Sequence, residues 1–459
     1  MKNKILYTTL LILFPGILWP IAAQKPVSTL NLDHLTLDEA IAYSLNNSPE
    51  LAVKRLMQQK DEQELSKVQR SKIPDIYLSN DYRRNIIIPS TPIPASMMNQ
   101  GADPSQMLYM KFNTDWNSGA GVNLSYDIFN PAMHRQTSEQ KQQNNINRYD
   151  TQISETDIRA NIARAYAECV ISQDQLESLK TDTVYYQQSL AEATELYFKE
   201  KISLQDKNNA IIAYNTSLTQ FLNAEKVLFS VKANLLYLLG AEVSDKNTAE
   251  LHLSEDIAAL YAKMDHSLAG NIASDSLTGG LSLARQAEVI ALAESRITSA
   301  SLKYAPTLSL SGFYGTNFYG NDFNLSDRNH WHGNSYISLS VRIPVTRALT
   351  TSKEVSQLKL QEQIERENLR KLQNQKNKEW LDAQAQLIAS EKEYGMSRKN
   401  YTLTTENLKA AQALLGKGYL LNKDYLSEQV KCRNAYQNVL QSAYNVFINV
   451  INLQKIIAE

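Results

Sequence analysis

Few residues of this chain have the types and spacing that catalysis or metal binding needs. His330-Trp331-His332 is the best candidate for a metal site, because imidazole binds zinc, but no third ligand lies nearby in the sequence. Gly416-Lys417-Gly418 lacks the upstream Gly and the following Ser or Thr of a phosphate-binding loop. Cys169 and Cys432 have no CxxC spacing, which excludes a zinc ribbon, a redox dithiol and a disulfide framework. With no GxSxG, HExxH or Gly-rich dinucleotide motif, we expect no enzyme, no metal and no cofactor.

Composition narrows the class of protein further. The 47 basic and 48 acidic side chains leave a formal charge of -1, so the broad basic field of a nucleic-acid binder is absent. The chain has only 15 Gly and 12 Pro among 459 residues, about half the usual share. Because these residues interrupt helices, their scarcity predicts long helices over most of the chain.

The N-terminus has the pattern of an export signal. Lys2 and Lys4 precede an apolar run, and Ile21-Ala22-Ala23 closes it, which predicts a signal peptide over 1–23; an uncleaved anchor is the alternative. Beyond it, no apolar run reaches the length of about 18 residues that a membrane-spanning helix needs. We therefore expect an exported protein that is either soluble outside the inner membrane or inserted as a β-barrel.

The chain contains an internal repeat. Residues 73–79 match 305–311, and residues 124–128 match 339–343, with a longer connection between the two matches in the first unit. We predict a first repeat over 24–240, an inter-repeat linker over 241–280 that forms an equatorial region, and a second repeat over 281–459. Each repeat contains a helix, a pair of strands and a long helical hairpin.

Alternating residues predict strands at about 75–83, 120–129, 307–315 and 336–345. In isolation, such strands are typical of half a soluble sandwich, but their length also suits tilted membrane strands. Four strands cannot close a barrel with a lumen, so this interpretation requires several chains. The residues predicted to face lipid are Val122, Leu124, Tyr126, Ile128, Ile337, Leu339, Val341 and Ile343.

The helices between the strands fall into matched sets. Outgoing helices are predicted over 132–198 and 346–415, with return helices over 203–239 and 420–458. At 1.5 Å per residue the outgoing helices are about 100 Å long and the return helices about 55 Å. Helices over 49–72 and 282–304 can stack on the return helices and make up the difference. A tunnel wall requires such columns, although a plain coiled coil with one solvated face has the same pattern.

These features together resemble the TolC-type outer membrane efflux proteins. The resemblance covers nearly all of the mature chain, from Leu35-Thr36-Leu37-Asp38-Glu39-Ala40-Ile41 and Asn47-Ser48-Pro49-Glu50-Leu51, through the strand junctions at Pro74 and Pro306, to both hairpin tips. It implies a mainly α-helical chain that forms a homotrimer, with a helical tunnel and a shared 12-stranded membrane β-barrel. The partners that it implies are a periplasmic adaptor protein, an inner-membrane transporter and the lipid of the outer membrane.

The family's hairpin tips follow a pattern of Tyr-x-x-Gly-x-x-Ser/Thr-x-x-Asp. The first tip has Tyr197, Glu200, Ser203 and Asp206, and the second has Leu415, Gly418, Leu421 and Asp424, so each departs from the pattern. The resemblance implies a periplasmic gate at Asp424 and Asp206, although Ser427 replaces a further acidic residue; alternatively, both acids only favour a helix dipole. It also implies that the tips contact the adaptor through Lys199, Glu200, Lys201, Lys417, Gly418 and Tyr419.

We therefore expect a passive outer membrane exit channel of a tripartite efflux pump, with its helical tunnel in the periplasm and drugs or other small molecules as its cargo. Two alternatives stay open: the outer membrane duct of a type I protein secretion system, and a soluble periplasmic coiled-coil adaptor. An adaptor would carry one helical hairpin, whereas this chain has two hairpins and two strand pairs.

Overall fold

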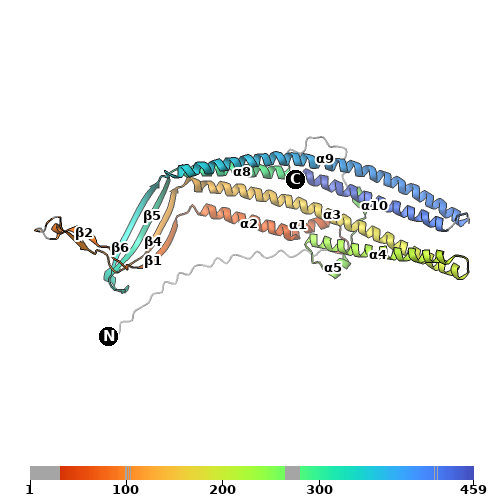
Figure 1. Cartoon of the computed structure of the whole chain (residues 1–459), viewed down its shortest axis with the longest axis horizontal. Coiled ribbons are helices and arrows are strands. Elements are labelled where there is room, and N and C mark those ends of the chain that lie inside the picture. Colours follow the sequence, from red (N-terminus) through yellow and green to blue (C-terminus); the bar gives the residue numbers. More distant parts are fainter. Residues whose placement is uncertain are drawn as a thin grey trace, which may run out of the picture.

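The computed structural model describes residues 31–98, 101, 103, 105–263, 280–417, 419–420 and 422–459. The expected signal peptide over 1–23 and the tip residue Gly418 lie outside this part of the chain. The molecule is long and narrow, with a β-sheet at one end and two helical hairpin tips at the other (Figure 1). Within the described residues, no helix is long and apolar enough to cross a membrane.

The first repeat begins with two short helices, α1 (Leu37–Asn47) and α2 (Pro49–Arg70). Thr36 and Glu39 form a capping box at α1, since the Thr36 hydroxyl accepts from the Glu39 N–H and the Glu39 carboxylate accepts from the Thr36 N–H. Pro49 begins α2, where its missing N–H costs no helical hydrogen bond. The sequence therefore sets where both helices begin.

The long hairpin of the first repeat consists of α3 (Pro131–Phe198) and α4 (Leu204–Leu239). Asn130 caps α3 by accepting a hydrogen bond from the Met133 N–H. Gly240 ends α4 with a φ of 73°, and a Cβ there would lie 2.8 Å from the Asn47 carbonyl oxygen. This close approach brings the end of α4 against the α1–α2 junction, where a side chain would not fit.

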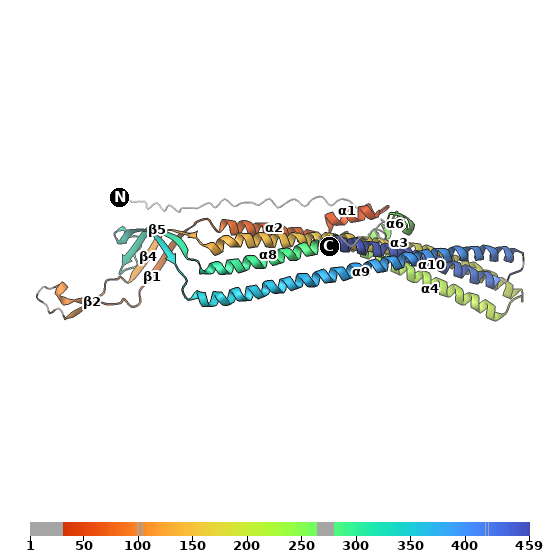
Figure 2. The same ribbon diagram turned by 90° about the horizontal axis from the view of Figure 1, so that it is seen from above.

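The second repeat has the same arrangement, with α8 (Leu281–Ser301), α9 (Arg347–Gly416) and α10 (Asn422–Ala458). The Ser282 N–H donates to the Glu459 carbonyl, so the start of α8 meets the end of α10. Both return helices therefore continue end to end into the helix that leads to the strands. Helices α2, α3, α8 and α9 lie side by side toward the sheet (Figure 2), and α3 packs against α8, which packs against α9.

The sheet contains β1 (Asp75–Arg84), β4 (Trp116–Phe129), β5 (Thr307–Gly320) and β6 (Trp331–Arg342). They form one antiparallel sheet in the order β1-β4-β5-β6, which joins the two repeats through the β4–β5 pair. Strand β6 begins before the expected residue 336 and ends before the expected 345. The connection between β1 and β4 contains a small hairpin of β2 (Thr91–Pro94) and β3 (Met107–Met110), with the 3-10 turn η1 (Ala95–Met97), which projects beyond the sheet (Figure 1).

The core lies near the middle of the molecule, where the hairpins cross the short elements between the repeats. These elements are the helices α5 (Asp245–Glu250) and α6 (Ile257–Lys263). Two 3-10 turns, η3 (Leu302–Tyr304) and η4 (Arg328–His330), lie outside this region, next to the strands of the second repeat. Fully buried side chains from both repeats meet in the core: Leu35, Leu51, Ile162, Tyr166, Leu239, Leu260, Leu387 and Leu453. Burial of this apolar surface holds the two hairpins to the linker.

Candidate functional site

The first hairpin tip is a Schellman turn at the end of α3. The Lys201 N–H donates to the Leu196 carbonyl and the Glu200 N–H donates to the Tyr197 carbonyl. Glu200 has a φ of 59°, the left-handed conformation that the family pattern gives to Gly. Lys199 caps the helix and pairs with Glu195 one turn earlier. The tip geometry is therefore kept although its Gly is replaced.

Asp206, the first predicted gate residue, lies in the capping box at the start of α4. Its carboxylate accepts from the Ser203 hydroxyl at 2.7 Å and from the Ser203 N–H at 3.3 Å, and the Asp206 N–H donates back to the hydroxyl. Both residues begin the helix in the way that the Ser-x-x-acid pattern favours. The carboxylate of Asp206 is thus engaged in a local structural contact.

The second tip repeats the turn at the end of α9. The Tyr419 N–H donates to the Leu414 carbonyl at 3.0 Å, the same bond that Lys201 makes in the first tip, and Lys417 occupies the cap position. Asp424 lies in the first turn of α10 and is exposed. The other predicted tip residues, Lys199, Glu200, Lys201, Lys417 and Tyr419, all lie in or beside the two turns.

Each tip has an exposed aromatic ring; Tyr419 belongs to the predicted tip set, whereas Phe198 does not. Phe198 is 75% exposed and Tyr419 is 80% exposed. The Lys207 ammonium lies 4.8 Å from the centre of the Tyr197 ring and 5.6 Å from that of Phe198. The adjacent Tyr197-Phe198 pair, directly before the turn, was the sequence signal for this surface. Large exposed rings beside charged groups are typical of protein interaction surfaces.

One face of the sheet is apolar, and the other is polar apart from an aromatic row of Tyr77, Phe313 and Tyr336. On the apolar face, Leu124 of β4 pairs with Ile76 of β1 and with Gly312 of β5, and Gly312 pairs in turn with Ile337 of β6. Tyr126 of β4 pairs with Leu310 of β5, which pairs with Leu339 of β6. The side chains of Ile337, Leu339, Val341 and Ile343 are exposed, as are those of Val122 and Ile128, while Leu124 and Tyr126 are half-buried. The opposite face carries polar residues, such as Asn123, whose amide donates to the Ser79 hydroxyl.

A bulge interrupts the alternation at the end of β4. The register shifts between Asp127 and Phe129, so Phe129 stands opposite Leu308 and Ile128 is left without a partner. Of the residues predicted to share the apolar face of this strand, Val122, Leu124 and Tyr126 follow the ladder, and Phe129 continues it in place of Ile128. A bulge cannot be seen in the alternation itself, because it depends on the partner strand.

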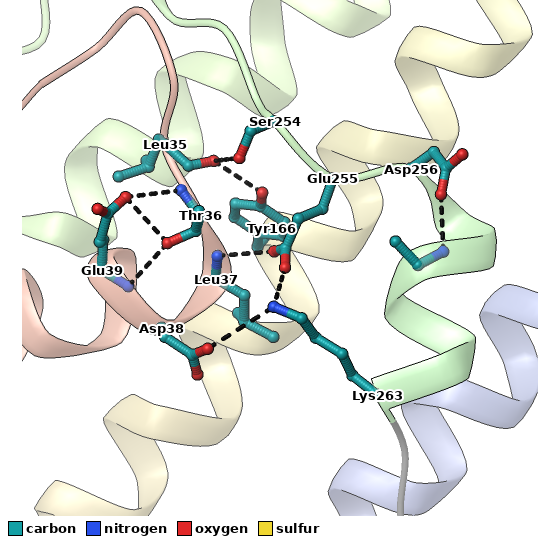
Figure 3. A network of polar contacts seen from close by, with 11 residues as sticks. Leu35, Thr36, Leu37, Asp38, Glu39, Tyr166, Ser254, Glu255, Asp256 and Lys263 are labelled. Carbon is teal, nitrogen blue, oxygen red and sulfur yellow. Dashed lines mark hydrogen bonds and ion pairs between the residues drawn. The ribbon is translucent and has the colours of Figure 1, made fainter.

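A polar network ties the linker to the start of the first repeat (Figure 3). The Tyr166 hydroxyl donates to the Leu35 carbonyl at 2.8 Å, and the Leu37 N–H donates to the Glu255 carboxylate at 2.9 Å. Lys263 pairs with Glu255 and lies 3.7 Å from Asp38. Burial acts to raise the pKa of Glu255, but the contacts with Lys263 and the Leu37 N–H hold it below its ordinary value. The network is a structural clasp rather than a reactive centre.

The candidate metal residues do not form a metal centre. The Nδ1 atom of His330 contacts the Tyr319 carbonyl, and His332 pairs with Asn317 across the ladder. Among the described residues, no group of three or more His, Cys, Asp and Glu is placed to hold a metal ion. Cys169 and Cys432 are both buried and unbridged.

The arrangement was compared with known proteins. No protein-family model and no curated protein matches the sequence. Solved structures do match: a sheet at one end, two long hairpins and a central linker define the TolC-type outer membrane channel fold, and this chain has that fold. The resemblance inferred from the sequence is thereby confirmed at the level of the fold.

Three of the matching structures illustrate the likeness. The outer membrane channel CmeC of Campylobacter jejuni has a TM-score of 0.72 at 14% identity, over 92% of this chain and 85% of that chain. The outer membrane protein VceC of Vibrio cholerae gives 0.69 at 15% identity, over 92% and 96%. The MtrE outer membrane channel of Neisseria gonorrhoeae, in its open state, gives 0.69 at 13% identity, over 95% and 93%.

Proposed function

We propose that this chain forms a homotrimeric exit channel in the outer membrane. In this proposal three copies of the four-stranded sheet close one 12-stranded barrel, and the helices continue it as a tunnel through the periplasm. The channel is a passive conduit, not an enzyme, for drugs or other small molecules delivered by an inner-membrane transporter and a periplasmic adaptor. Two of the structural neighbours, CmeC and MtrE, are outer membrane channels by name.

One observation carries this proposal: the four-stranded sheet has two unpaired edges among the described residues and one apolar face. Strands β1 and β6 are the outermost strands of the sheet, so each has one edge that no strand of the described residues pairs. Free edges are normally paired, covered or charged, and an apolar face such as that of β6 is costly in water. Pairing of these edges between copies would satisfy their backbone hydrogen-bonding groups, and contact with lipid would remove the apolar face from water.

The proposal is tested by membrane fractionation and cross-linking. The full chain is expected in the outer membrane fraction, resistant to carbonate extraction, and as a cross-linked trimer in detergent. Cysteines introduced at facing positions on β1 and β6 should form disulfides between copies only. A monomer in the soluble periplasmic fraction would overturn the proposal and favour the soluble adaptor instead.

The tips supply the proposed contact with the adaptor. In the first tip the exposed ring of Phe198 lies beside Lys199 and Glu200 in the sequence. In the second tip the exposed ring of Tyr419 lies between Lys417 and Asp424 in the sequence. We expect Phe198→Ser and Tyr419→Ser to abolish cross-linking to the adaptor while the trimer still assembles. Tyr109→Ser, which removes an exposed ring on β3 at the opposite end, is the matched control. Identifying the transporter that co-purifies would distinguish small-molecule efflux from type I protein secretion.

A further inference from the structure

A crevice between the two helical hairpins lies on the tip side of the core. Its volume is about 390 Å³, and α3, α9 and α10 all contribute to its walls. Its principal lining residues are Asp174, Asp182, Tyr401, Gln429, Arg433 and Tyr436. This volume is within the range of small-molecule sites, about 300 to 1,000 Å³. Neither the proposed barrel nor the tips make use of this crevice.

The crevice carries an excess of negative charge. Asp182 pairs with Arg433, with its Oδ2 atom 2.5 Å from Nη1. Asp174 is half-buried and has no cationic partner within the described part of the chain, while Glu177 adds a further carboxylate at the rim. Burial, together with the nearby Asp256, raises the pKa of Asp174 to about 6. An unpaired carboxylate in such a place is costly to ionise unless a cation joins it.

The walls of the crevice suit an organic cation better than a bare metal ion. The rings of Tyr401 and Tyr436 lie 5.3 Å apart between centroids, at 47° to each other, and form an aromatic wall. A carboxylate and aromatic faces are groups that recognise an alkylammonium ion. The described residues offer no cluster of acidic, His or Cys ligands placed for a metal.

We propose that this crevice is a binding site for a small primary amine or diamine. The ammonium group donates hydrogen bonds to the Asp174 carboxylate, and its alkyl chain lies against the rings of Tyr401 and Tyr436. Because the site joins α3 of the first hairpin to α9 and α10 of the second, the bound amine stabilises the packing of one hairpin on the other. The proposal stands independently of the transport function.

Amine binding should depend on pH through Asp174. The other charged groups around the crevice are Asp256 from the linker, Glu177 on α3, and the pair of Asp182 on α3 with Arg433 on α10. The phenol of Tyr436 on α10 is neutral, because burial and Asp174 raise its pKa. The ionised form that binds the amine dominates above pH 6 and is lost below it. With a pKa of about 6, only about a tenth of Asp174 is ionised at pH 5, which predicts about tenfold weaker binding than at pH 7.5.

Calorimetric titration of the full detergent-solubilised chain with 1,4-diaminobutane tests the proposal. We expect saturable binding at pH 7.5, about tenfold weaker binding at pH 5, and no binding of the uncharged 1,4-butanediol. Asp174→Asn should lower the affinity at least about tenfold, the scale of a lost ion pair. Glu192→Gln, which removes an exposed carboxylate elsewhere on α3, should leave the affinity unchanged. Absence of diamine binding, or equal affinity in Asp174→Asn, overturns the proposal.

Cys432 offers a second measurement inside the same crevice. It lines the cavity and is nearly buried, while Cys169 is fully buried. A small cationic methanethiosulfonate reagent should label Cys432, and 1,4-diaminobutane should slow this labelling in the parent but not in Asp174→Asn. Cys432→Ser is the control for the site of labelling. Labelling at the same rate with and without the diamine would show that the amine does not occupy the crevice.

Discussion

At the scale of single residues, Glu200 carries backbone strain that its neighbours do not. Its φ of 59° costs a residue with a Cβ about 1 kcal/mol or more relative to Gly. We therefore expect Glu200→Gly to raise the free energy of unfolding by up to about 1 kcal/mol. Glu192→Gly, in the regular part of α3, should lower it by about the same amount. Thermal unfolding of both variants would check the opposite signs; a loss of stability in Glu200→Gly would contradict the argument.

Glu255 is the second residue whose environment predicts a measurable effect. Its side chain is only 8% exposed, and the Leu37 N–H and Lys263 hold its pKa below its ordinary value. A lowered carboxyl pKa stabilises the fold above the unfolded-state pKa, and this stability is lost as the pH falls through the folded-state pKa. Glu255→Gln should therefore cost about 1 kcal/mol at pH 7, limited by the exposure of Lys263.

The difference in unfolding free energy between Glu255→Gln and the parent should shrink below about pH 4.5, the ordinary pKa of a free Glu side chain. Glu250→Gln is the matched control, because Glu250 is exposed and its Oε1 atom lies 3.9 Å from the Lys246 Nζ atom, a weak surface ion pair. A constant difference across the whole pH range would mean that Glu255 does not act through its charge.

At the scale of elements, the two faces of β6 give opposite predictions for one substitution. Leu339 is 62% exposed on the apolar face, and Ser340 follows it on the polar face, opposite Ser309. If the apolar face contacts lipid near the bilayer midplane, Leu339→Arg should cost about 2 to 4 kcal/mol of folding free energy in membranes. Ser340→Arg should leave assembly intact. Folding yield into lipid vesicles measures both, and similar yields would argue against lipid contact at Leu339.

At the scale of the whole molecule, the long helices α3 and α9 separate the hairpin tips from the sheet, so the tips can act on groups far from it. Helix α3 has 68 residues and α9 has 70, about 100 Å each. In the proposed trimer, three exposed Asp424 carboxylates would surround one axis at the tip end and form a ring that binds cations. Asp206 is less suited to such a ring, because its carboxylate caps α4.

The gate prediction is tested by conductance in planar bilayers. We expect Asp424→Asn to reduce cation selectivity and to weaken block by multivalent cations applied from the tip side. Asp206→Asn serves as the comparison and should reduce helix stability more than selectivity, by about 1 kcal/mol. Unchanged conductance, selectivity and block in Asp424→Asn would leave this residue as a charge that favours the dipole of α10.

Features that depend on local periodicity could be predicted from the amino-acid sequence. The scarcity of Gly and Pro, the Thr36 capping box, the Pro49 helix start and the alternation within β4 and β6 predicted the long helices and the strands, because each relies on neighbours a few residues away. The pairing of these elements into the TolC-type fold also followed from the repeat, through a resemblance that the solved structures confirm.

Contacts between side chains from distant parts of the chain could not be predicted from the sequence and are seen only in the folded molecule. The bulge beside Ile128 depends on the register with β5, the clasp of Tyr166 and Glu255 joins α3 to the linker, and the crevice at Asp174 needs α3, α9 and α10 together. None of these contacts leaves a periodic signal, because each partner is distant in sequence. Burial of one side chain by another segment determines its pKa, its hydrogen bonds and its strain, and local sequence patterns do not carry that information.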